Sequence, residues 1–270
     1  MMGGVERPAP TLVHFGRRSL ARFVELEGFD RSMALAGQAF AALLPLLIVC
    51  GTVAHGSTDE VADDLIARFD VSGSAADTLR EAVAQPPDSG VSVVGVVLLV
   101  VSALSFTRAM QRLYVRAWRL EKLGVRGNLW GLLWLAAFIA YWSLQPAIVS
   151  LVDGALGLAV SLALSTALWL CTPWLLVAKR VSWPRLLPQA VLSAVSLAAL
   201  AVGAAIYLPH AIASTSAEFG ILGVAFTLLS LLFAVALVLV VTAALGATLA
   251  DPRPASPRAE DAVGRTAHDD

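Results

Sequence analysis

The chain of 270 residues has a formal net charge of −1, is 58% hydrophobic and is only 14% charged, whereas soluble proteins average about 25% charged residues. This composition excludes an intrinsically disordered protein, argues against an ordinary soluble enzyme and provides no overall basic field for nucleic acid. Two cysteines are too few for a disulfide framework or a zinc site. We therefore predict an all-α integral membrane protein.

Residues 1–31 are predicted to form a cytoplasmic segment with an amphipathic helix over residues 11–29. At 100° per residue, apolar side chains such as Leu12 and Phe23 share one side of this helix, and Arg17 and Arg22 share the other. Two placements stay open. The helix can lie along the inner lipid headgroups, or it can pack on the cytoplasmic ends of the membrane spans.

A membrane-spanning helix needs about 20 mostly apolar residues. Residues 32–250 contain six apolar segments of roughly that length or longer, all free of Asp, Glu, Lys and Arg, so we predict a bundle of six transmembrane helices. The predicted spans are residues 33–54, 89–107, 127–152, 154–178, 186–208 and 219–250.

The charges outside the spans predict the orientation of the bundle. Of the Lys and Arg residues, seventeen precede span one, follow span six, or lie between spans two and three or four and five. Only Arg68 and Arg80 lie on the other side. Because cytoplasmic loops carry an excess of Lys and Arg, both termini are expected in the cytoplasm.

Two further segments lie outside the predicted spans. Residues 55–88 form an acidic outer loop whose carboxylate spacing matches no EF-hand, so a solvated acidic face is favoured over a cation site. Residues 251–270 are rich in proline, alanine and charge without an apolar period, and they are predicted to be a disordered cytoplasmic tail.

Span two is predicted to continue into a basic helix at the inner membrane surface. Its arginines Arg108, Arg112, Arg116 and Arg119 fall on one helical face. Our hypothesis is that they bind anionic lipid headgroups, since each cation near such a surface contributes about 1 kcal/mol. The alternative is the ordinary positive flank of a cytoplasmic loop.

A second candidate site consists of polar residues and prolines inside the spans. These residues are Gln38, Pro45, Gln145, Pro146 and Pro173. A proline in a span frees a backbone carbonyl, so the residues form either a polar path through the bundle or ordinary helix kinks. Because no charged residue lies inside a span, an amphiphilic cargo fits better than coupling to an ion through a buried carboxylate.

Small residues recur four positions apart in three of the predicted spans. The pairs are Gly37 with Ala41, Ser161 with Ser165, and Ala201 with Ala205. Small side chains let helices approach each other closely, so these pairs predict helix contacts. We predict no catalytic residue, no metal site and no cofactor, since no histidine has a second ligand at suitable spacing and no nucleophile or phosphate-loop motif is present.

Three stretches of the sequence resemble the YihY/BrkB family of six-span bacterial inner-membrane proteins. They are Phe29–Pro45 (FDRSMALAGQAFAALLP), Thr107–Trp118 (TRAMQRLYVRAW) and Phe219–Ser230 (FGILGVAFTLLS). The resemblance implies a protein of the bacterial plasma membrane, and some members of the family are linked to lipid export. Part of the family carries an old ribonuclease label, which this sequence does not support.

These features predict a multi-pass membrane protein that acts as a translocase or exporter of a lipid or other amphiphile. The alternative is a scaffold or component of an envelope complex that transports nothing, and an enzyme is not expected. Membrane lipids are the expected partners, a homo-oligomer stays open, and no nucleic acid partner is expected.

Overall fold

The computed structural model describes residues 12–53, 89–124, 126–149, 151–152 and 154–250. Within these residues every regular element is an α-helix, which confirms the all-α class. The helices are α1 (Leu12–Glu25), α2 (Gly28–Val53), α5 (Ser89–Ala117), α6 (Arg126–Val149), α7 (Gly154–Leu176), α8 (Trp183–Phe219) and α9 (Ile221–Ala250). The predicted acidic loop and the predicted tail lie outside the described residues.

Three of these helices are long and apolar enough to cross a membrane. Their apolar stretches are Leu156–Leu176 in α7, Trp183–Thr215 in α8 and Leu222–Ala250 in α9. Helix α6 contains a shorter apolar stretch, Gly127–Trp142. Helices α2 and α5 cover the first two predicted spans, so the described helices are compatible with six spans, and the count of six stays a prediction.

Two helices extend beyond the predicted spans. Helix α5 continues past Thr107 to Ala117, so span two runs into the basic helix as predicted. Helix α8 continues without a break past Leu208, the predicted end of span five, to Phe219, so the span bounds stay a prediction. Pro209 lies inside the helix, and the contact of Thr215 with Thr227 of α9 holds the segment that follows.

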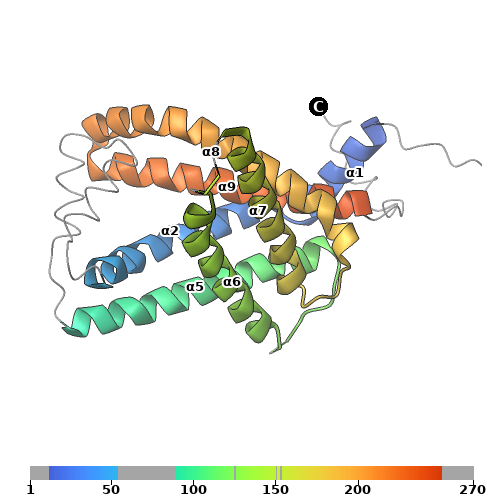
Figure 1. Cartoon of the computed structure of the whole chain (residues 1–270), viewed down its shortest axis with the longest axis horizontal. Coiled ribbons are helices and arrows are strands. Elements are labelled where there is room, and N and C mark those ends of the chain that lie inside the picture. Colours follow the sequence, from blue (N-terminus) through green and yellow to red (C-terminus); the bar gives the residue numbers. More distant parts are fainter. Residues whose placement is uncertain (1–11, 54–88, 125, 150, 153, 251–270) are drawn as a thin grey trace, which may run out of the picture.

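The helix axes in the bundle run in two main directions (Figure 1). Helices α2, α5, α8 and α9 run lengthwise, and α6 and α7 cross them steeply in this view. Helix α9 packs along α8 and α2, α2 packs along α5, and α7 packs along α8 and α6. Helix α1 lies at the same end of the bundle as the C-terminal ends of α5 and α9, whereas the α8–α9 connection lies at the opposite end (Figure 1).

We call the end that carries α1 the basic end, because Arg22, Arg31, Arg112, Arg116 and Arg119 lie there. Much of the buried core also lies towards this end, and its largest side chains are Leu26, Met110, Leu113, Tyr114, Leu176 and Leu186. Large apolar side chains elsewhere are more than half exposed, among them Val101, Ile139, Leu158, Val202 and Phe226. Such an apolar surface suits contact with lipid rather than water.

Candidate functional site

Helices α8 and α9 are held together at the end of the bundle opposite α1. Gly220 connects them with a left-handed φ of 59°. A Cβ atom on Gly223 would clash with the backbone carbonyl oxygen of Thr215, so the two helices touch at this point. The hydroxyl oxygens of Thr215 and Thr227 lie 3.1 Å apart and form a hydrogen bond across the same contact.

The same two helices are joined again towards the basic end. A Cβ atom on Gly246 would clash with the side chain of Gln189, which is itself buried. One turn further along α8, the Ser193 hydroxyl donates a hydrogen bond to Thr242 at 2.8 Å. Helices α8 and α9 are therefore held together near both ends. These two contacts set the distance between the two helices in the segment that lies between the contacts.

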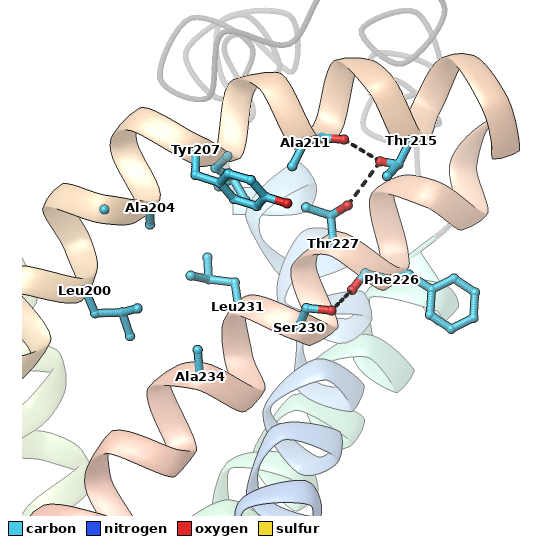
Figure 2. Close-up of a pocket in the computed structure, with 12 residues that line it drawn as sticks. Leu200, Ala204, Tyr207, Ala211, Thr215, Phe226, Thr227, Ser230, Leu231 and Ala234 are labelled. Carbon is cyan, nitrogen blue, oxygen red and sulfur yellow. Dashed lines mark hydrogen bonds between the residues drawn. The ribbon is translucent and has the colours of Figure 1, made fainter.

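Between these two contacts lies a cavity of about 460 Å³. Small residues of α8, including Gly203, Ala204 and Ala211, form one wall, and Phe226, Ser230 and Leu231 of α9 form part of the other. Figure 2 shows hydroxyl groups of Thr215, Thr227 and Ser230 beside this cavity, together with the phenol of Tyr207. The cavity is thus mostly apolar, with hydroxyls gathered towards the α8–α9 connection.

A second cavity of about 590 Å³ adjoins the first. The two share Leu200, Ala204, Leu208 and Leu231, and the second extends to Trp142 of α6. Pro209 and Ala205 also line it. Because proline has no amide hydrogen, Pro209 cannot donate the usual helical hydrogen bond to the carbonyl of Ala205.

Two of the three small-residue pairs do not form the predicted helix contacts. Ala201 and Ala205 are exposed and line the larger cavity. Gly37 and Ala41 are also exposed, and a Cβ atom on Gly37 would meet no atom within 4 Å. For these two pairs the predicted contact is wrong, because four-residue spacing identifies a helix face but does not identify what faces it.

At the basic end, two arginines of the predicted headgroup site form ion pairs with the α1–α2 turn. The Arg116 guanidinium donates to both carboxylate oxygens of Glu27, with N–O distances of 3.2 and 3.3 Å. Arg31 also approaches Glu27, at 3.5 Å. Arg119, just beyond α5, pairs with Glu25 at 2.7 Å.

Several guanidinium groups lie close together where the α1–α2 turn meets α5. Burial, followed by the neighbouring charge of Arg116, lowers the pKa of the Arg31 guanidinium; Arg112 lowers it further, and Glu27 opposes the shift. Arg108 and Arg112 are exposed on α5, and neither has an ion-pair partner among the described residues. The structure therefore brings Arg112 and Arg116 close to Arg31, which was not among the predicted site residues, whereas Arg119 pairs separately with Glu25.

Helix α1 contacts the bundle, as one of its two predicted placements requires. Arg22 is buried and donates two hydrogen bonds to the carbonyl oxygen of Ala117, the last residue of α5. Ser19 and Leu26 are buried beside it. Helix α1 is therefore packed on the end of the bundle, although Leu20 and Val24 on its outer side remain 57% and 61% exposed.

The residues of the predicted polar path lie on three different helices. The Gln38 side-chain oxygen in α2 is buried without a partner among the described residues, Gln145 in α6 is half-buried, and Pro173 is buried inside α7. Pro45 and Pro146 fall within α2 and α6, but their side chains lie outside the described part. No hydrogen bond between described residues joins these helices through this set, so its role stays a prediction.

Two further glutamines, Gln111 and Gln189, form hydrogen bonds between segments at the basic end. Gln111 of α5 donates to the carbonyls of Gly127 in α6 and Leu176 in α7, at 3.1 and 3.2 Å. The Trp118 indole donates to Gln189 at 3.1 Å. Their polarity inside apolar surroundings was the available signal, but the partners are distant in sequence.

The part of the chain that the structure describes has few other groups that could react or bind a metal ion. Cys171 is a free thiol. No group of three or more His, Cys, Asp or Glu residues lies together there in an arrangement that could hold a metal ion. The described residues thus offer mostly apolar cavities with hydroxyls along α8 and α9, and guanidinium groups at the opposite end of the bundle.

Comparison with known proteins gives one match. Residues 19–265 match the family described as Virulence factor BrkB. No curated protein and no solved structure matches the chain. The family match confirms the resemblance found in the sequence and covers most of the chain, including every described helix except the start of α1.

Proposed function

We propose that this chain, which belongs to the BrkB family of membrane proteins, moves a lipid or another amphiphile across the membrane. The observation that carries this proposal is the pair of adjoining cavities along α8, with volumes of about 460 and 590 Å³. Ligand pockets commonly have volumes of about 300–1,000 Å³ and are mostly apolar with a few placed polar groups. Both cavities fall in this range of volumes and are mostly apolar, and the smaller one is lined by the hydroxyls of Thr215, Thr227 and Ser230.

The position of the cavities favours a ligand that enters from the bilayer. Helices α8 and α9 are two of the three helices that are long and apolar enough to cross a membrane. The cavity walls are mostly apolar, and the hydroxyls of Thr215, Thr227 and Ser230 lie on the side towards the α8–α9 connection. An apolar tail would lie against these walls, and a polar group could donate to the hydroxyl oxygens, because the hydroxyl protons are already donated to backbone carbonyls of the helices.

The basic end would be the first contact for a negatively charged headgroup. Arg108 and Arg112 are exposed there, and near an anionic surface each cation contributes about 1 kcal/mol of attraction. Since Lys and Arg favour the cytoplasmic side, we place this end in the cytoplasm and the α8–α9 connection outside. The polar cavity end would then receive the headgroup on the far side of the membrane.

The decisive experiment measures lipid translocation in proteoliposomes with a variant that fills the cavity. Gly203 lines the smaller cavity, and a Cβ atom there would meet no atom within 4 Å. Gly203→Leu should therefore fold normally, fill part of the cavity and lower the translocation of a tail-labelled lipid several-fold. Gly37→Leu is the matched control, because Gly37 also has open space around it but does not line either cavity.

A second variant tests the basic end. The double change Arg108→Gln and Arg112→Gln removes two exposed charges without breaking an ion pair to a described residue. It should slow translocation of anionic lipids more than that of neutral lipids. Two results would contradict the proposal. The first is that no lipid moves faster than in empty liposomes, and the second is that Gly203→Leu and the unchanged protein translocate lipid at equal rates.

A further inference from the structure

Two guanidinium groups, those of Arg31 and Arg116, contact one carboxylate where α2 meets α5, and the guanidinium group of Arg112 belongs to the same face of α5. Arg116 holds both oxygens of Glu27, and Arg31 reaches one of them at 3.5 Å. Arg112 lies one helical turn before Arg116 on the same face of α5, and its charge acts on Arg31. Among the described residues, Glu27 is the carboxylate that pairs with Arg31 and Arg116, and Arg112 has no ion-pair partner, so positive charge is in excess in this part of the structure.

We propose that Arg31, Arg112 and Arg116 form a binding site for a phosphomonoester, and that the carboxylate of Glu27 occupies this site when no phosphate is bound. Arginine binds carboxylate and phosphate oxygens in the same forked geometry, so one can replace the other. A phosphomonoester carries a charge of about −1.5 to −2, which matches the excess positive charge better than a carboxylate does.

The contacts around Glu27 allow this exchange. Its side chain is 55% exposed and that of Arg116 is 48% exposed, and exposed ion pairs of this kind are weak. The backbone of Glu27 is fixed separately, since its amide donates to Val24 and its carbonyl accepts from the Arg31 amide. Displacing the carboxylate therefore requires only a side-chain rotation, and the α1–α2 turn can stay in place.

Two neighbouring carboxylates, those of Glu25 and Asp30, form no ion pair with Arg31, Arg112 or Arg116 among the described residues. Glu25 pairs with Arg119 at 2.7 Å, outside the group of three arginines. Asp30, in the first turn of α2, is exposed. Arg31 is held in position by a hydrogen bond of 2.6 Å from its Nε atom to the carbonyl of Leu26, which leaves the rest of its guanidinium group available to a ligand.

This inference deepens the proposed function, because it names the headgroup chemistry that the basic end would accept. The phosphomonoester could belong to a lipid or be free in solution, and one set of binding measurements separates the two. The full-length protein in neutral nanodiscs would be titrated with phosphatidic acid, with phosphatidylglycerol as the diester comparison and with inorganic phosphate. Native mass spectrometry or calorimetry would give the affinities.

The expected result is tighter binding of phosphatidic acid than of phosphatidylglycerol. Glu27→Gln should raise the affinity for phosphatidic acid by about two- to fivefold, since it removes a competing ion pair. Arg112→Gln should lower the affinity without affecting folding, because this side chain is exposed. Glu121→Gln and Arg185→Gln change the same charges at exposed positions outside the site and should leave the affinity unchanged.

The proposed site would be overturned if each variant changed the affinity for phosphatidic acid as much as its control did. That result, with Glu27→Gln equal to Glu121→Gln or Arg112→Gln equal to Arg185→Gln, would indicate a general surface potential. Binding of inorganic phosphate as tight as that of phosphatidic acid would support the site and identify a soluble ligand. Selective binding without translocation would support this inference and contradict the proposed function. Translocation without a preference for the phosphomonoester would overturn this inference alone.

Discussion

The guanidinium group of Arg22 donates two hydrogen bonds to the carbonyl oxygen of Ala117, at 3.2 Å from Nε and 2.8 Å from Nη2. Ala117 is the last residue of α5, so its carbonyl has no donor within its own helix. A cation at this position also complements the negative end of the helix dipole. One side chain of α1 thus caps a helix that lies 95 residues further along the chain.

Replacing Arg22 should release α1 from the bundle. Arg22→Ala leaves the buried Ala117 carbonyl without this donor, which should cost about 1–3 kcal/mol. Hydrogen exchange in α1 should become faster, and trypsin should cleave at Arg17 or Arg18 more readily. His14→Ala is the control, because His14 is exposed on the same helix and its replacement leaves both trypsin sites in place. Unchanged exchange rates in Arg22→Ala would show that the cap does not hold α1.

Gly223→Ala should destabilise the α8–α9 pair. Its Cβ atom would clash with the backbone oxygen of Thr215, which cannot move without shifting α8. In a helix with free space the same change is favourable by about 0.5–1 kcal/mol, so Gly37→Ala should be neutral or stabilising. Thermal unfolding in detergent should show a lower midpoint for Gly223→Ala than for Gly37→Ala. Equal midpoints would mean that the helices separate at this point.

Ala178→Gly should stabilise the protein. Ala178 follows α7 with a left-handed φ of 54°, and its amide donates to the Leu175 carbonyl as part of the helix cap. A residue with a Cβ atom is disfavoured there by roughly 1 kcal/mol relative to glycine. Ala163→Gly, at an exposed position inside α7, should instead lower the unfolding free energy by about 1 kcal/mol. Thermal unfolding of both variants checks this, and a destabilised Ala178→Gly variant would contradict this account of the cap.

The contact between Trp134 and Thr172 should couple α6 to α7. The indole donates to the Thr172 hydroxyl at 3.1 Å, and this hydroxyl donates to the Leu168 carbonyl at 2.8 Å. Trp134→Phe and Thr172→Val should each lower the unfolding free energy by about 1 kcal/mol or more, because both side chains are buried. The double variant should lose less than the sum of the single variants, and strict additivity would argue against this bond.

Much of the fold could be predicted from charge-free apolar runs. Because a span must keep charged side chains out of the hydrocarbon, the runs at 127–152, 154–178 and 219–250 closely match α6, α7 and α9. The predicted span five ended at Leu208, although the charge-free run continues to Ala217 and α8 continues to Phe219. Pro209 lies inside α8, and the contact of Thr215 with Thr227 of α9 holds the segment that follows it.

The sequence by itself determined that this is an apolar helical membrane protein and that arginines share a face of α5, because hydropathy and helical periodicity are properties of a single segment. Only the tertiary structure decided that Glu27 and Glu25 meet Arg116 and Arg119, and that Gly203, Ala204 and Ala205 line cavities. Periodicity places a residue on a face of its helix. The neighbour of that face depends on how helices from distant parts of the chain pack, and no local pattern records that choice.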